Sequence, residues 1–217
     1  MIKTMAKPAR PTLARDQAAL ERGVTAAPGT TKARIERAAL LLFCARGIDA
    51  VTTREIAAAS GISEGALYRH YKGKDALSQT MFFTIHDRLA AEVQNAARQS
   101  TTLEEQARAI VAAYCRIADE DWALFSYHLL TTHRFLPRTD KSTNKSEKDN
   151  PVSIIEGVIT AAMERREIPA GDSALKAASA LGVVLQAALH KAYGRVQGTL
   201  SNHQDTLSRG VIAVLHS

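Results

Sequence analysis

The chain has 217 residues, of which 46% are hydrophobic, enough to bury a core in one large domain or in a small domain joined to a larger one. No apolar run is long and charge-free enough to span a bilayer, and the N-terminus lacks the apolar stretch of a signal peptide, so we expect a cytoplasmic protein with no membrane partner. The net charge of +6 lies wholly in residues 1–100, where 15 Lys and Arg face 9 Asp and Glu. A basic half favours a nucleic acid as partner, and a merely soluble basic surface is the alternative.

The sequence carries no recognisable catalytic or metal motif. We find no P-loop, dinucleotide fingerprint, His-Glu-x-x-His or Cys-x-x-Cys pattern. The histidines at 86, 128 and 133 and the acidic run 119–121 match no standard metal-site spacing. Cys44 and Cys115 lie far apart in apolar helical contexts, so we expect buried reduced thiols, with a redox sensor as the alternative. We therefore expect a protein that is not an enzyme and has no metal or cofactor.

Residues 1–30 contain prolines and scattered basic side chains without sustained periodicity, and they predict a flexible basic arm. Such an arm could touch phosphates or enter a minor groove, and a solvated tail is the alternative. Apolar residues at helical spacing then predict a first helix from residue 31 or 32 to Arg46. Gly47 is expected to end this helix as a C-terminal cap.

The stretch 52–77, TTREIAAASGISEGALYRHYKGKDAL, predicts two short helices across a tight turn. The first helix is expected over 53–59 with Thr52 as its N-cap. Gly61 supplies the turn, because glycine takes a positive φ without steric cost. Ser63 is placed to cap the second helix through its hydroxyl. The outward face of that helix is small at its start and polar at its end, which suits a helix lying in a DNA major groove.

The pattern Leu67-Tyr68-x-x-Tyr71 followed by Lys74-x-x-Leu77 resembles the DNA-binding domain of the TetR (tetracycline-repressor-type) transcriptional regulators. The resemblance begins at about residue 34, is specific to about residue 77, and continues beyond only as a general pattern of helices. It implies an all-α protein with an N-terminal three-helix helix-turn-helix domain. It also implies a C-terminal helical domain that binds a ligand and forms a dimer.

Two positions depart from the usual family pattern. Ser60 stands where the family usually has alanine, and Tyr71 where it usually has phenylalanine; both changes are conservative in size. The resemblance implies phosphate contacts at Thr52, Tyr68 and Lys74 and base-edge contacts in the early part of the second helix. The predicted DNA-binding residues are Thr52, Thr53, Arg54, Ser63, Glu64, Gly65, Ala66, Tyr68, Arg69, His70, Lys72 and Lys74.

The remainder of the chain predicts six helices, over 76–98, 103–118, 122–135, 151–165, 173–196 and 206–215. The first of them would start at the DNA and end inside the body, where it can act as a lever. The polar, charged stretch 137–150 predicts a long exposed loop. The helix at 173–196 is apolar almost all round and must be covered on every face, so we expect a second subunit on one side.

The resemblance implies that the last two helices form a four-helix interface in a homodimer. The predicted interface residues are Leu181, Leu185, Leu189, Tyr193, Leu207, Val211 and Leu215. It also implies a pocket in the body for a small-molecule effector, apolar with a few polar groups. The predicted lining residues are Phe82, His86, Tyr114, Trp122, Phe125, Tyr127, His128 and His133. Most of these side chains could equally belong to a solid core.

Together these features predict three parts: a basic arm over 1–30, a DNA-binding domain over 31–77 with its helix-turn-helix at about 52–71, and an effector-binding and dimerisation domain over 78–217. The predicted function is a repressor that leaves a palindromic double-stranded DNA operator when its effector binds; repression follows from the family alone. Two alternatives stay open. One is an architectural DNA-binding protein without an effector, and the other is a helical enzyme acting on small molecules.

Overall fold

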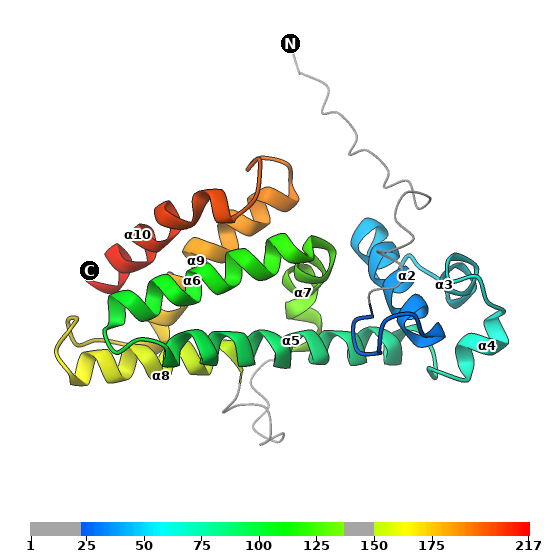
Figure 1. Cartoon of the computed structure of the whole chain (residues 1–217), viewed down its shortest axis with the longest axis horizontal. Helices are drawn as coiled ribbons and strands as arrows, with labels where there is room; N and C mark the ends of the chain where they lie inside the picture. The colour runs from blue at the N-terminus through cyan, green and yellow to red at the C-terminus, as the bar shows by residue number, and fades with distance from the viewer. Residues whose placement is uncertain (1–22, 137–149) are drawn as a thin grey trace, which may run out of the picture. The chain divides into compact units, whose positions relative to one another are not determined.

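The computed structural model describes residues 23–136 and 150–217, and every regular element in these ranges is a helix. The predicted all-α class is confirmed. The chain forms two compact units, residues 1–81 and 82–217 (Figure 1). Residues 1–22 of the predicted arm and nearly all of the predicted polar loop lie outside the described residues.

The first unit is built from three helices and the beginning of a fourth. These are α2 (Thr31–Arg46), α3 (Thr53–Ala59), α4 (Glu64–Tyr68) and the first residues of α5 (Lys74–Arg98). Helix α3 packs against both α2 and α4, and Figure 1 shows α4 following α3 across a short turn. Gly47 ends α2 with a φ of +79°, as predicted.

Side-chain caps determine where the two short helices begin. Thr52 Oγ1 accepts from Glu55 N at 3.2 Å, and the Glu55 carboxylate accepts from Thr52 N at 2.8 Å, which forms a capping box. Ser63 Oγ accepts from Ala66 N at 3.2 Å. Between the helices, Gly61 has a φ of +69°, a conformation that glycine adopts readily. The predicted bounds of the first helix, both predicted caps and the turn glycine are confirmed.

A small apolar core holds the first unit together. Ile35, Ile56, Leu67 and Leu77 come from four different helices, and all four side chains are fully buried. Removing each of them from water stabilises the unit by roughly 1.5–3 kcal/mol. Helix α4 has five residues, far fewer than an isolated helix needs to be stable in water. Leu67 therefore holds α4 in place through packing, because intrinsic helix propensity alone does not stabilise so short a helix.

A buried carboxylate ties the segment before α2 to the turn after α4. Backbone N–H groups of Val24, Thr25 and Ala26 donate to Glu36 Oε2 at 2.9, 2.7 and 3.1 Å. The hydroxyls of Thr25 and Tyr71 donate to Glu36 Oε1, the latter at 2.6 Å. Burial alone would raise the pKa of Glu36, but these hydrogen bonds outweigh it and hold that pKa below its usual value. The last residues of the predicted flexible arm thus differ from the prediction, because they are hydrogen bonded to the first unit.

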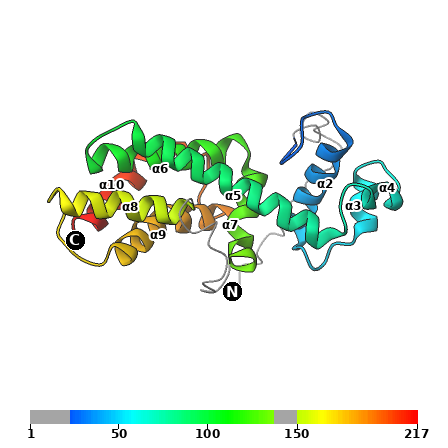
Figure 2. The same ribbon diagram turned by 90° about the horizontal axis from the view of Figure 1, so that it is seen from below.

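The second unit contains the rest of α5 and the remaining helices. They are α6 (Leu103–Glu120), α7 (Trp122–Phe135), α8 (Pro151–Glu164), α9 (Ser173–Ala192), the 3-10 helix η1 (Ser201–His203) and α10 (Gln204–Leu215). Helix α9 packs on α8 and α10, α10 also packs on α6, and α7 packs on α6 and α9 (Figures 1 and 2). Helix α9 ends four residues earlier than predicted, because Tyr193 closes it and Gly194 takes a φ of +70°.

Helix α9 is apolar on more faces than its own unit covers. By length and composition alone it could cross a membrane, contrary to the expectation from the sequence, and only 22% of its most apolar stretch is buried. Leu175 and Tyr193 at its two ends are 65% and 61% exposed. Between them, exposed residues recur every three or four positions, at Ala178, Gly182 and Gln186. Helix α9 thus has one face packed on α8 and α10 and a second face that is open.

Two histidines are stacked inside the second unit. His86 Nδ1 and His128 Nε2 lie 3.0 Å apart, and the ring of Phe82 stacks on both imidazoles. His86 Nε2 is buried without a hydrogen-bond partner. Burial lowers the pKa of His128 to about 3, with a smaller contribution from His86, and burial also lowers the pKa of His86 against the opposing charge of Asp87. Both rings are therefore neutral in the folded unit at pH 7.

This pair predicts a loss of stability in mild acid. The histidine pKa in the unfolded chain is about 6.5, above both folded values, so protons bind preferentially to the unfolded state below that pH. The stabilising effect of the neutral pair is complete above pH 6.5 and is lost as pH falls towards about 3 for His128. We expect urea unfolding between pH 7.5 and 5.5 to show a decline of up to about 1.4 kcal/mol per pH unit for each histidine.

Replacing both rings with phenylalanine should flatten this decline, because neither position can then bind a proton. The matched control is His133→Gln, which alters an exposed histidine on α7, the helix that carries His128. The control should keep the pH dependence of the wild type. An equally steep decline in the His86→Phe/His128→Phe variant would contradict the assignment.

Candidate functional site

Three predicted DNA-binding side chains meet where α3 and α4 adjoin. Thr53 Oγ1 lies 2.5 Å from Glu64 Oε1 and 3.4 Å from the Tyr68 hydroxyl. Tyr68 is 51% exposed, an unusual position for a large aromatic side chain. The turn at Gly61 and the burial of Leu67 aim this cluster outward, because they orient α4 against α3.

The other predicted DNA-binding residues surround this cluster with basic and small side chains. Arg69, His70 and Lys72 are exposed and follow α4 directly. Of the predicted set, the exposed members are Thr52, Arg54, Ser63, Gly65, Tyr68, Arg69, His70 and Lys72, and the half-buried ones are Thr53, Glu64, Ala66 and Lys74. A short helix with a small-residue start and basic side chains after its end can enter a major groove and neutralise the neighbouring phosphates.

Lys74 differs from the others because its ammonium is engaged inside the first unit. Nζ donates to the carbonyl oxygens of Ile48, Asp49 and Val51 at 3.1, 3.0 and 2.9 Å. These three bonds use all the protons of the ammonium group. Sequence reasoning predicted a phosphate contact here, whereas the structure has Lys74 closing the turn between α2 and α3. The carbonyls at 48, 49 and 51 lie outside helices, and the ammonium donates to all three, although the Ile48 oxygen also accepts from Val51 N at 3.3 Å.

The comparison with known proteins identifies this arrangement. Residues 35–81 match the family of bacterial regulatory proteins described as the tetR family. The crystal structure of a tetR-family bacterial regulatory protein from Rhodococcus RHA1 superposes with a TM-score of 0.68 at 22% identity, covering 86% of this chain and 95% of that one. The chain carries a TetR-family DNA-binding domain over these residues. It has the fold of a DNA-binding transcription regulator.

Other relatives match either the DNA-binding part or the fold. The HTH-type transcriptional regulator YerO of Bacillus subtilis is 48% identical over 46 residues, 21% of this chain and 16% of YerO. The nucleoid occlusion factor SlmA of Salmonella paratyphi B is 26% identical over 107 residues, 49% of this chain and 53% of SlmA. The chain thus spans about half or less of these relatives. FadR of Bacillus subtilis, solved in complex with stearoyl-CoA, superposes with a TM-score of 0.67 at 16% identity, covering 84% and 98% of the two chains.

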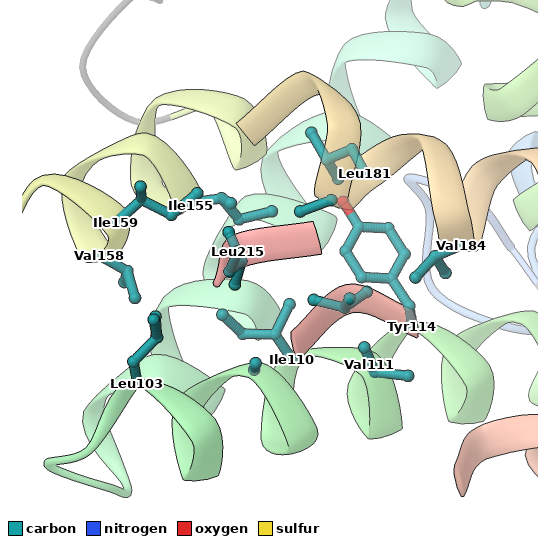
Figure 3. Close-up of a pocket in the computed structure, with 13 residues that line it drawn as sticks. Leu103, Ile110, Val111, Tyr114, Ile155, Val158, Ile159, Leu181, Val184 and Leu215 are labelled. Carbon is teal, nitrogen blue, oxygen red and sulfur yellow. The ribbon is translucent and has the colours of Figure 1, made fainter. Parts of the chain in front are cut away.

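The second unit contains an apolar cavity of about 40 Å³ between α6, α8, α9 and α10 (Figure 3). Every lining side chain is aliphatic except Tyr114, whose oxygen points towards Leu181 in Figure 3. Burial raises the pKa of the Tyr114 hydroxyl, so it stays protonated and can donate a hydrogen bond. The lining residues are Leu103, Ala107, Ile110, Val111, Tyr114, Ile155, Val158, Ile159, Ala180, Leu181, Val184, Val211 and Leu215.

Of the eight predicted pocket residues, Tyr114 lines this cavity and the other seven do not. Phe82, His86 and His128 stack on one another, and Trp122 stacks on Phe125 with ring centroids 6.0 Å apart. Tyr127 is fully buried and His133 is exposed. The prediction selected aromatic and titratable side chains, and most of them pack ring against ring. The cavity lies instead among branched aliphatic side chains, which leave space where four helices meet.

The predicted dimer residues divide between the open and the packed face. Leu207, Val211 and Leu215 on α10 are buried within their own unit, and the last two line the cavity. They therefore cannot present a surface to a partner, contrary to the prediction. Leu181, Leu185 and Leu189 on α9 are half-buried and Tyr193 is exposed. Sequence reasoning missed Leu175, which is the most exposed large apolar side chain of α9.

Sequence reasoning also missed Glu36 and the aliphatic cavity wall. Glu36 was hidden in the apolar face of the first helix, where a carboxylate breaks the periodicity, and this break was the available signal. Among residues 23–136 and 150–217, no three His, Cys, Asp or Glu side chains are grouped so that they could hold a metal ion.

The contacts of Lys74 predict a structural effect of its removal. Lys74→Ala should lower the free energy of unfolding by about 1–3 kcal/mol, because three carbonyls lose a charged donor. Thermal unfolding followed by circular dichroism measures this change. The matched control is Lys72→Ala, an exposed lysine two residues away, which should leave stability unchanged and weaken binding to all duplexes. If Lys74→Ala is as stable as the wild type and binds DNA more weakly, Lys74 is instead a phosphate contact.

Proposed function

We propose that the chain is a homodimeric cytoplasmic repressor that binds a palindromic operator and leaves it when an apolar small molecule enters the second unit. The observation that carries this proposal is the pairing of two features in one TetR-family chain. One is the outward cluster on α3 and α4, and the other is the aliphatic cavity between α6, α8, α9 and α10. In this proposal the predicted DNA-binding residues bind the operator, and Lys74 acts through the stability of the first unit.

A dimer is supported by the open face of α9. Leu175 and Tyr193 mark its two ends, and small residues such as Ala178 and Gly182 lie between them. Small residues permit close approach of a partner helix, and large apolar side chains at the ends supply buried area. A dimer also doubles the number of base pairs read, which a helix of five residues needs.

An apolar effector is supported by the composition of the cavity wall. A wall of aliphatic side chains with the Tyr114 hydroxyl suits a hydrocarbon chain with at most one polar group. FadR of Bacillus subtilis, which has a similar fold, was solved with stearoyl-CoA, and we propose an acyl chain here too. The cavity of about 40 Å³ is much smaller than the ~150 Å³ that holds a benzene molecule in another protein. An effector must therefore separate the helices around the cavity, and it binds the widened conformer with higher affinity.

A second candidate function, DNA binding without a small-molecule effector, is favoured by two specific observations. The cavity is small, and SlmA, a relative over about half of its length, is a nucleoid occlusion factor. A DNA-binding protein that needs no small molecule would have both features. Enzymatic activity finds no such support, because the family and the fold are those of transcriptional regulators.

The effector proposal predicts that filling the cavity blocks release from DNA. Binding sites would first be selected from random duplexes, and release would then be titrated with acyl-CoA thioesters of increasing chain length. Long chains should release the wild type, and Ala180→Leu should reduce this response at least about tenfold, because the added side chain occupies the cavity. The control is Ala91→Leu on the exposed side of α5, which should respond as the wild type does. Specific DNA binding that no acyl chain alters would favour the second function.

The dimer proposal predicts that a charge on the open face of α9 separates the subunits. Leu175→Glu should raise the dimer dissociation constant at least about tenfold, because two carboxylates would be buried in a two-fold interface. Analytical ultracentrifugation measures this change. Val152→Glu is the matched control, since Val152 is an exposed apolar residue on α8. Dissociation by Val152→Glu with an intact Leu175→Glu dimer would move the interface to α8.

A further inference from the structure

Glu64 is the one residue in the first turn of α4 whose side chain can form a hydrogen bond. Gly65, Ala66 and Leu67 follow it, and Leu67 is buried in the core. The next polar side chains are those of Tyr68 and Arg69, one turn further along. In helix-turn-helix proteins the first residues of the second helix face the base edges. Whatever hydrogen bonding this turn offers to a base therefore comes from a carboxylate.

Thr53 holds this carboxylate in one orientation. Its hydroxyl lies 2.5 Å from Glu64 Oε1, and the Tyr68 hydroxyl lies 3.4 Å from the same Thr53 oxygen. Glu64 is half-buried, so its rotamers are restricted before DNA arrives. A side chain fixed in advance loses less conformational entropy on binding than a free one. With Oε1 accepting from Thr53, Oε2 is the oxygen that would face a base.

A carboxylate can only accept hydrogen bonds, and this restricts which bases it can face. In the major groove guanine presents the acceptors N7 and O6, and thymine presents O4, so both would repel it. Adenine and cytosine present donors, at N6 and N4 respectively. The N6 donor of adenine adjoins the acceptor N7, whereas the N4 donor of cytosine adjoins a carbon-bound hydrogen. Cytosine is therefore the base that best matches a single carboxylate.

We propose that Glu64 selects cytosine at one position of each operator half-site and that Thr53 is its positioning residue. This inference rests on the proposed function, because it requires that α4 enters the major groove. The rest of the half-site is read by other side chains, so a change at Glu64 alters one position and leaves the others. A change at Thr53 loosens the carboxylate without replacing it.

The substitution that separates this proposal from a general DNA contact is Glu64→Gln. A glutamine amide both donates and accepts, and it pairs with N6 and N7 of adenine. The preferred base at one position of each half-site should change from cytosine to adenine. In Glu64→Ala that position should lose its preference, by a factor on the order of tenfold in relative affinity. In Thr53→Val the preference for cytosine should weaken without a change of base.

The experiment is selection of binding sites from random duplexes by the full-length wild type and these three variants at one salt concentration. The control is Glu164→Gln, which removes one negative charge at an exposed position in the second unit and should enrich the wild-type site. The inference is overturned if Glu64→Gln changes no cytosine of the wild-type site, or if all variants enrich the same site. Either result leaves the proposed function intact. Failure of the wild type to enrich any sequence overturns both.

Discussion

The burial of Ile56 and Leu67 on either side of the turn at Gly61 is the constraint on which the functional surface depends. Both side chains are fully buried, and the glycine takes the positive φ that lets α4 fold back onto α3. Helix α4 is too short to exist without this packing. The same packing leaves Tyr68, Arg69 and His70 on the outside. A loss of the apolar contact would remove the outward cluster together with the helix.

Polar groups inside the first unit reinforce this arrangement. Glu36 gathers three backbone N–H groups and two hydroxyls, and one of those hydroxyls belongs to Tyr71, where the family usually has phenylalanine. A phenylalanine would leave one lone pair of a buried carboxylate without a donor, which is costly. The tyrosine and the glutamate are thus matched to each other in this chain. Lys74 has a comparable role at the turn between α2 and α3. Both residues stabilise the first unit beneath the proposed DNA-binding surface.

The second unit combines a packed aromatic cluster with an aliphatic cavity. The rings of Phe82, His86 and His128 are stacked, and burial keeps both imidazoles neutral at pH 7. The cavity lies between helices that meet through branched side chains, and α9 and α10 both contribute to it. Because α9 also carries the open face, a molecule that widens the cavity would shift the helix on which the proposed dimer depends. In the proposed mechanism, occupation of the cavity thereby alters the spacing of the two DNA-binding units.

Interactions between neighbouring residues allowed several local features of this protein to be predicted from its sequence. The caps at Thr52 and Ser63, the turn at Gly61 and the all-α class were predicted, because each depends on neighbours within a few residues. The partners of Lys74, the inward face of α10 and the position of the cavity were decided by tertiary structure. An ammonium can donate to phosphate oxygens or to carbonyl oxygens, and an apolar stripe can face a partner or its own core. Only the packing of distant segments selects between such equivalent contacts.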